Sequence, residues 1–433
     1  MGHPFLDDLT ARGLIYQMTG GGAQGGTTLA ERLSAGPTTA YIGFDPTAKS
    51  LHVGSLLQIL MLVRLQRHGH RPLAIVGGGT GLIGDPSFKA SERAMLTTDL
   101  LAENLAGIRS QLERFLDFDG PRGALLLNNA DWLTSVPLIE FLRDVGKHFT
   151  VNQMIARDSV TQRLDGREQG LSFTEFTYAL LQAYDYVVLS DRFGCDLQMG
   201  ASDQWGNILD GIDLIRRMRG RSAFGLTTPL VTKADGTKFG KTESGSVWLD
   251  PELTKPFQFF QFWLNGDDAN VLKYLDYFTF LDADERHQLA EQHRGAPEKR
   301  IAHRALAREI TRLVHGEDAL ASALKATAVL FEGGDLRGLT ESELLDAFAE
   351  TPRTVISKSL LETPEAQWPA VIALSGLESS KGKARKAIES GAISVNGTAV
   401  TSPELSLTLS DILPGGFVVL RRGKKTYHIL EIR

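Results

Sequence analysis

The sequence predicts an α/β protein in which a parallel sheet comes first, a helical part follows, and a small mixed α+β part ends the chain. Residues 39–44 and 71–77 have the apolar pattern of buried strands, and the segment between them, 50–68, has apolar residues at helical spacing. Strand, helix and strand in this order form a βαβ unit, which implies parallel strands joined by a right-handed crossover. Residues 251–330 are helix-rich, and β-rich runs return only near the end of the chain.

The remaining elements of the first part follow in chain order. Helical patterns cover residues 97–118, 135–164, 173–186 and 208–218, and short strand patterns cover 124–128 and 196–199. The glycine run at 77–81 directly follows a predicted strand. Because ligands of open α/β sheets bind at the carboxyl ends of the strands, we expect this run beside a binding site.

Composition excludes several classes of protein. A chain of 433 residues is too long for one core and predicts two or three domains. Its mean hydropathy of −0.10 and the lack of a long apolar run argue against a membrane span, and the N-terminus has no secretory signal pattern. Cys195 is the only cysteine, which excludes an intramolecular disulfide and a cysteine-rich metal site. We expect a cytoplasmic protein.

Charge is distributed unevenly along the chain. Residues 378–433 contain nine basic and five acidic residues, a net charge of +4, so the rest of the chain is at −10 within a total of −6. A basic end on an acidic body is typical of a nucleic-acid partner. On charge alone, a solvated face of mixed charge explains the pattern equally well.

Two segments far apart in the sequence fit one phosphate site. The first, residues 45–55, leaves a strand, turns at Pro46 and enters a helix at His52. The second is the lysine segment, residues 238–242, with the sequence Lys-Phe-Gly-Lys-Thr. If the fold brings them together, a helix N-terminus and two ammonium groups converge on a polyphosphate. Taken singly, the first is an ordinary capped helix and the second an ordinary charged loop.

These motifs resemble those of one family. The chain resembles the bacterial-type tyrosyl-tRNA synthetases, which are class I aminoacyl-tRNA synthetases, over nearly its whole length. Residues 52–55 resemble the HIGH element of that family and the lysine segment resembles its KMSKS element. Longer and more specific strings also match, at residues 41–47, 81–87, 178–185 and 202–207.

The resemblance implies a domain organisation. A Rossmann-like catalytic domain would span residues 1–245 and include a helical dimerisation region at about 130–170. A helical tRNA-binding domain would follow at 246–335, then a linker at 336–366. An S4-like RNA-binding domain would occupy 367–433, where a basic helix at 381–390 precedes a tight turn at Asn396-Gly397.

The resemblance also implies roles for individual residues. The tyrosine-binding residues would be Tyr41, Asp45, Asp85, Tyr178, Gln182, Asp185 and Gln204. The ATP-binding residues would be Gly43, His52, Gly54, Ser55, Asp203, Lys238 and Lys241. The catalytic residues around the phosphates would be Thr47, His52, Lys89, Arg93, Lys238 and Lys241. The RNA-binding residues would be Lys381, Lys383, Arg385 and Lys386. Ser55, Phe88, Ala201 and Gly240 depart from the residues often found in the family.

The implied activity is ATP-dependent ligation of L-tyrosine to tRNA(Tyr) through a tyrosyl-adenylate. Mg²⁺ would accompany ATP as a charge partner, with no dedicated protein metal site and no tightly bound cofactor. We expect a homodimer that binds tRNA and no membrane. Three alternatives remain open at this point: a tryptophan-specific relative, a small-molecule nucleotidyltransferase, and a non-catalytic RNA-binding protein derived from a synthetase.

Overall fold

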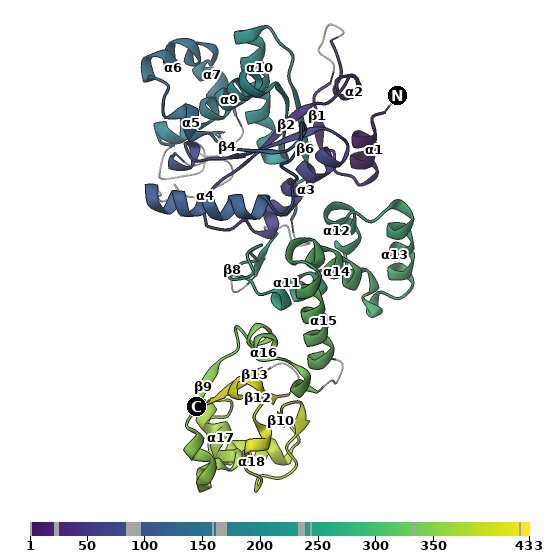
Figure 1. The fold of residues 1–433 in the computed structure, drawn as a ribbon, viewed down its shortest axis with the longest axis vertical. Helices are drawn as coiled ribbons and strands as arrows, with labels where there is room; N and C mark the ends of the chain where they lie inside the picture. The colour runs from purple at the N-terminus through teal and green to yellow at the C-terminus, as the bar shows by residue number, and fades with distance from the viewer. Residues whose placement is uncertain are drawn as a thin grey trace. The chain divides into compact units, whose positions relative to one another are not determined.

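The chain folds into two compact units in the computed structural model (Figure 1). The structure describes residues 2–20, 26–83, 97–157, 160–161, 171–232, 239–242, 245–331, 335–423 and 426–433. The first unit comprises Met1–Asp250 and Asp267–Ala302, and the second comprises Pro251–Gly266 and His303–Arg433. None of the helices in these described ranges combines the length and hydropathy of a membrane span.

The first unit is built on a six-stranded sheet with the order β1-β6-β5-β2-β3-β4. Its strands are β1 (Gln17–Met18), β2 (Thr39–Phe44), β3 (Arg71–Val76), β4 (Leu125–Asn128), β5 (Cys195–Ala201) and β6 (Phe224–Thr228). A separate hairpin pairs β7 (Lys241–Thr242) with β8 (Gly245–Ser246). All pairs of the large sheet are parallel except β1 with β6, so the predicted parallel sheet is confirmed. The sequence analysis did not anticipate β1 or β6.

Helices cover this sheet and extend beyond it. They are α1 (Pro4–Ala11), α2 (Leu29–Ser34), α3 (Val53–Arg67), α4 (Thr98–Leu112), α5 (Ala130–Leu133), α6 (Leu138–Asp144), α7 (Val151–Ile155), α9 (Phe173–Phe193), α10 (Trp205–Arg219), α12 (Val271–Phe278) and α13 (Ala283–Gly295). Ten residues of α3 are buried, because this helix packs against β2 and β3 and is apolar around most of its circumference.

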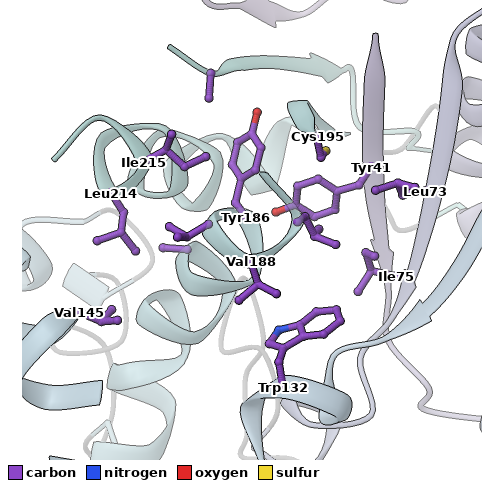
Figure 2. Close-up of a cluster of buried hydrophobic side chains, with 14 residues drawn as sticks. Tyr41, Leu73, Ile75, Trp132, Val145, Tyr186, Val188, Cys195, Leu214 and Ile215 are labelled. Atoms are coloured by element: carbon purple, nitrogen blue, oxygen red, sulfur yellow. The ribbon is translucent and has the colours of Figure 1, made fainter. Parts of the chain in front are cut away.

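The α9 face of the sheet carries a continuous core. Alternate residues of β2 and β3, Tyr41, Leu73 and Ile75, point to this face and meet side chains from α9 and α10 (Figure 2). The ring of Tyr41 lies 5.2 Å from that of Tyr186 in an edge-to-face arrangement, and Trp132 of α5 closes the cluster. The core therefore fixes Tyr41 and α9 relative to each other.

Strand order places the binding site. The chain runs from β2 outward to β3 and β4 on one side, and then returns to add β5 and β6 on the other side of β2. Adjacent loops therefore diverge at the carboxyl ends of β2 and β5, and this divergence opens a crevice at the switch point of a parallel sheet.

The second unit contains a helical part and a five-stranded sheet. Its helices are α11 (Pro256–Leu264), α14 (Ile301–His315), α15 (Glu317–Phe331), α16 (Glu341–Ala347), α17 (Trp368–Ser375) and α18 (Lys381–Glu389). Its strands are β9 (Arg353–Ile356), β10 (Ile393–Val395), β11 (Thr398–Ala399), β12 (Phe417–Arg422) and β13 (Thr426–Ile432), in the order β11-β10-β12-β13-β9. The expected turn at Asn396-Gly397 joins β10 to β11, with positive φ at both residues as a two-residue hairpin requires.

The structure corrects two predicted boundaries. The linker predicted at 336–366 contains β9, which pairs in parallel with β13, and α16, whose Leu344 packs with Phe417 and Ile429. Successive residues of β12 face opposite sides of the sheet, so each side needs an apolar layer, and this segment supplies one of the two layers. The helical domain predicted at 246–335 is also divided, because 267–302 belongs to the first unit.

Candidate active site

A cavity of about 330 Å³ lies at the switch point between β2 and β5. The predicted site residues that line it are Tyr41, Gly43, Asp45, Thr47, His52, Gly54, Ser55, Tyr178, Gln182, Asp185, Asp203 and Gln204. Gly77 and Thr80 of the glycine run also line it, as their place at the carboxyl end of a strand predicted. Asp85, Lys89, Arg93 and Lys238 lie outside the described residues, and only the backbone of Lys241 is described.

One end of the cavity holds two buried polar groups that face the same space. Asp185 of α9 is 4% exposed and Tyr41 of β2 is 2% exposed. The buried Tyr41 hydroxyl has no hydrogen-bond partner within the described part of the chain. A buried hydroxyl without a partner costs folding free energy, so its retention at a cavity wall indicates that a ligand satisfies it.

Two residues that the sequence analysis did not select hold the Asp185 carboxylate. The indole Nε1–H of Trp132 donates to Oδ1 at 2.7 Å, and Nδ2 of Asn129 donates to Oδ2 at 2.9 Å. Asn129 also donates to the Thr80 hydroxyl and accepts from the Gly79 amide, which fixes the orientation of its amide group. Asn129 directly follows β4. Because ligands of parallel sheets bind at the carboxyl ends of the strands, the end of this strand could have been searched for site residues in the sequence, whereas no local pattern points to Trp132.

Burial governs the protonation of this end of the cavity. Loss of solvent raises the pKa of Asp185 to about 7, although the hydrogen bonds from Asn129 and Trp132 act in the opposite direction. Burial likewise raises the pKa of the Tyr41 hydroxyl well above its usual value, and the nearby Asp185 adds to the effect. Near neutral pH the Tyr41 hydroxyl therefore stays protonated, and the Asp185 carboxyl group is close to the pH at which it titrates.

Side-chain amides line the cavity wall between α9 and α10. Nε2 of Gln182 donates to Oε1 of Gln204 at 3.2 Å, and Nδ2 of Asn207 donates to Oε1 of Gln182 at 2.9 Å. Tyr178 lies one helical turn before Gln182 on α9 and is 6% exposed. These groups offer several donors and acceptors to a polar ligand atom at mid-cavity.

The N-terminus of α3 forms the opposite wall. His52 is the N-cap residue, and its Nδ1 accepts the Gly54 amide at 3.0 Å. In the neutral ring this leaves the proton on Nε2, so the imidazole can donate to an anion. The positive end of the helix dipole adds to the attraction for an anion, while the amides of Val53, Gly54 and Ser55 already donate to the Val247 carbonyl, to His52 Nδ1 and to the His52 carbonyl.

The lysine segment meets this same helix end. A Cβ on Gly240 would lie 2.7 Å from Cγ2 of Val53 and 3.2 Å from the Gly54 amide nitrogen, and Gly240 has a φ of +84°. The departure at Gly240 thus has a steric reason, since a side chain there would collide with α3. The fold therefore brings the described backbone of the lysine segment to the first turn of α3, as the pairing of the two segments predicted.

The predicted RNA-binding residues share one face of α18. Lys381, Lys383, Arg385 and Lys386 are all exposed, and the opposite face buries Ala384 and Ile388. Lys381 pairs with Glu365 at 3.2 Å and Arg385 pairs with Glu404 at 2.8 Å. Exposed pairs of this kind are worth at most about 1 kcal/mol, so a phosphate can replace the carboxylates.

Comparison with known families covers both units. A family model described as tRNA synthetases class I (W and Y) matches residues 33–332. A second, described as the tyrosine–tRNA ligase SYY-like C-terminal domain, matches residues 343–430. The start of the second match includes α16 and β9, in agreement with the corrected boundary.

Individual relatives extend this similarity to the full chain. A tyrosine–tRNA ligase of Roseiflexus castenholzii is 51% identical over 428 residues, covering 99% of each chain. One from Aliivibrio salmonicida is 50% identical over 98% of this chain and 97% of its own. Among solved structures, a C-terminally truncated mitochondrial tyrosyl-tRNA synthetase of Aspergillus nidulans has a TM-score of 0.68 at 31% identity, covering 76% of this chain and 94% of its own.

Proposed function

This chain belongs to the tyrosyl-tRNA synthetase family of class I aminoacyl-tRNA synthetases, and we propose that it activates L-tyrosine with ATP and transfers the tyrosyl group to tRNA(Tyr) in the cytoplasm. The observation that carries the proposal is the pairing of a buried hydroxyl at Tyr41 with a buried carboxylate at Asp185 at one end of the cavity. A phenol placed there would accept from Tyr41 and donate to Asp185.

This pairing also accounts for selectivity. A phenylalanine ring in the same position would leave both polar groups desolvated and without partners. Each such group costs roughly 1–3 kcal/mol, and more when charged. Selection against the missing hydroxyl follows from the two buried groups, without a second site that removes wrong products.

The middle of the cavity suits the amino-acid end of tyrosine. We assign the ammonium group to Tyr178, Gln182 and Asp85, where Gln182 offers its amide oxygen. Asp45 and Gln204 would lie beside the amino-acid end and the ribose. Asp203 would accept from the ribose hydroxyls, and Gly43 allows close approach of the nucleotide to β2.

The α3 end of the cavity suits the phosphates of ATP. Thr47 and His52 would bind the triphosphate at the positive end of α3, where Gly54 and Ser55 also line the cavity, with Mg²⁺ arriving as part of the nucleotide substrate. Lys238 and Lys241 of the lysine segment would join from the side of Gly240. Lys89 and Arg93 complete the proposed set of cations around the leaving group.

The chemistry needs positioning more than proton transfer. An oxygen of the tyrosine carboxylate attacks the α-phosphorus of ATP, the bond to the bridging oxygen breaks, and pyrophosphate leaves. A carboxylate is already ionised, so no general base is required. In the second step the terminal ribose hydroxyl of the tRNA attacks the adenylate carbonyl and AMP leaves. Catalysis then comes from alignment and from cations that stabilise charge developing on the phosphates.

The second unit supplies the proposed tRNA contacts. The exposed lysine and arginine side chains are spread over the side of α18 that does not carry the buried Ala384 and Ile388. Contacts to RNA phosphates are strongly salt-dependent and add affinity, whereas recognition of structured RNA depends on shape. A small-molecule nucleotidyltransferase would not need such a surface, and its presence in the same chain as the cavity supports a ligase.

We also propose a homodimer formed through α6 and α7. Large apolar side chains on these short helices are exposed in the single chain, among them Leu138 at 68%, Ile139 at 73% and Val151 at 59%. Clusters of this kind mark contact surfaces, and a two-fold contact with a second copy buries the same residues on both chains. Ile139→Glu should therefore yield a particle with the mass of one 47.3 kDa chain in light scattering. An unchanged dimer would exclude this interface.

Pyrophosphate exchange tests the function directly. We expect purified protein with Mg²⁺ and ATP to exchange labelled pyrophosphate with tyrosine and with no other amino acid. Exchange with tryptophan would assign the chain to the sister specificity, and no exchange with any amino acid would favour the RNA-binding alternative.

Two matched variants on α9 test the phenol site. Asp185→Ala should raise the KM for tyrosine about ten- to a hundredfold while the KM for ATP stays nearly constant, because a charged hydrogen bond is lost. Asp191→Ala serves as the control, because Asp191 lies on α9 with Asp185. This substitution removes an exposed ion pair with Arg219 and Arg221. Equal effects in the two variants would refute the assignment of Asp185.

A further inference from the structure

Helix α12 touches the chain on both sides of the segment 233–238, which contains the first catalytic lysine proposed above. We propose that Tyr274 of α12 is a positioning residue that sets the placement of the lysine segment for tyrosine activation. This inference rests on the proposed function, and it adds a role for a helix that lies outside the sheet and outside the cavity lining.

Tyr274 contacts the residues on either side of the segment 233–238, Thr232 and Phe239. Its hydroxyl donates to the backbone carbonyl of Thr232 at 3.0 Å, and its ring lies 5.0 Å from the ring of Phe239. Thr232 precedes residues 233–238 and Phe239 follows them. One side chain thus contacts two described residues, Thr232 and Phe239, that are seven positions apart in the chain.

The lysine segment has an aromatic residue, Phe239, between its two lysines. Its side chain is buried, and its ring stacks on Phe278 at 5.7 Å with an interplanar angle of 21°. Tyr274 and Phe278 are four residues apart and therefore share one face of α12. This face forms a socket for Phe239 and so holds the described backbone at residues 239–240 against α12.

The protonation of Tyr274 suits a fixed contact. Burial, with a further contribution from Asp267, raises the pKa of Tyr274 to about 12. The hydroxyl therefore remains a hydrogen-bond donor at every pH at which the enzyme would work, and a carbonyl acceptor such as that of Thr232 cannot titrate.

Helix α12 is itself attached to α3, the helix whose first turn binds phosphate in our proposal. Arg64 of α3 donates to the carbonyl of Thr279 at 2.6 Å, and Arg12 donates to the same carbonyl at 3.1 Å and to that of Asp276 at 3.2 Å. Asp8 pairs with both guanidinium groups, at 2.6 Å and 3.0 Å. These charged donors satisfy carbonyls at the C-terminal end of α12 that have no partner within the helix.

The lysine segment is consequently held from two directions by one rigid frame. Gly240 lies against the N-terminal turn of α3, and Phe239 lies in the α12 socket. The buried Arg64 joins α12 to the other end of α3. Because catalysis here depends on alignment, a small loss of order in this frame should act on the chemical step more than on tyrosine binding.

Tyr274→Phe tests the proposal with a matched control on the same helix. The variant keeps the ring that packs on Phe239 and removes only the hydroxyl that bonds Thr232. Tyr277→Phe removes a hydroxyl that donates to the Gly13 carbonyl at 3.2 Å, three residues further along α12 and away from the lysine segment. Both variants lose one hydrogen bond of the same type, so their thermal stabilities should fall by similar amounts.

Pyrophosphate exchange with saturating ATP separates the possible outcomes. We expect Tyr274→Phe to lower kcat roughly three- to tenfold with the KM for tyrosine unchanged, and Tyr277→Phe to leave both values at the wild-type level. Equal kcat values in the two variants, or parallel changes in kcat and in the KM for tyrosine, would overturn the positioning role alone. Absence of exchange in the wild-type protein would overturn the proposed function, and the positioning role with it.

Discussion

Trp132→Phe is the sharpest test of how the fold tunes the phenol site. The substitution keeps an aromatic ring in the core and removes the indole N–H that donates to Asp185 Oδ1 at 2.7 Å. A hydrogen bond to a charged group contributes roughly 1.5–3 kcal/mol, which corresponds to about one to two pKa units at 1.36 kcal/mol per unit. The pKa of Asp185, already raised to about 7 by burial, should therefore move to roughly 8–9.

The sign of the effect follows from which form of Asp185 binds the substrate. In the proposed site the ionised carboxylate would accept from the tyrosine phenol, and this form is lost as pH falls through the pKa. In the wild-type enzyme, kcat/KM for tyrosine should therefore fall below about pH 7, since this ratio reports groups of the free enzyme. At pH 7 the Trp132→Phe variant should be about five- to fiftyfold lower, and the gap should close as pH rises toward 9.

The assay is tyrosine-dependent pyrophosphate exchange measured between pH 5.5 and pH 9. Trp368→Phe is the control, because Trp368 is a buried tryptophan in the core of the second unit. It should lower stability without moving the pH profile of kcat/KM. A folded Trp132→Phe protein with the wild-type profile would refute the reasoning that the indole N–H sets the ionisation of Asp185.

Three further predictions concern the lysine segment, the RNA-binding face and the domain boundary. Gly240→Ala should lower kcat for activation about tenfold or more, because the added Cβ would collide with α3. Gly245→Ala is the control: Gly245 also has a positive φ, but an added Cβ would meet open space. This control should cost only backbone strain and leave kcat within about threefold. Replacing Lys383 and Lys386 together by Ala should weaken tRNA binding and reduce its salt dependence by about two phosphate contacts, with exchange unchanged; a salt dependence equal to that of the wild type would exclude this face. A protein truncated after residue 334 should be soluble and should activate tyrosine. A protein truncated after residue 360 should aggregate, because the apolar side chains of α16 and β9 would be exposed. Equal solubility of the two products by gel filtration would contradict the corrected boundary.

Much of the site could be predicted because its residues lie in strings that are specific even when read locally. His52 precedes a helix whose apolar spacing is visible in the sequence, and its place as the N-cap residue follows from that helix start. Tyr41 lies in a strand that an apolar run makes evident, and Asp185 lies in a helix recognisable by its periodicity. The resemblance to one family then paired these strings, and the fold places Tyr41, Asp185 and His52 around one cavity.

Other features depend on contacts between segments that are distant in the chain. The family resemblance implied a linker at 336–366, yet β9 and α16 complete a sheet whose second face would otherwise be exposed. Residues 267–302 follow the helical pattern of their neighbours, but the buried guanidinium groups of Arg12 and Arg64 bind the end of α12 within the first unit. Neither assignment has a local signal.

The sequence by itself therefore determined the parallel sheet, the order of the helical and mixed parts, and the two segments that meet at the first turn of α3. These follow from periodicity, capping and motif strings, which are properties of neighbouring residues. Only the tertiary structure decided that Asn129 and Trp132 hold Asp185, that Gly240 must lack a side chain, and that Tyr274 contacts both Thr232 and Phe239. The physical reason is that burial, close approach and hydrogen bonding across the fold depend on which surfaces pack together, and residue spacing along the chain does not specify that packing.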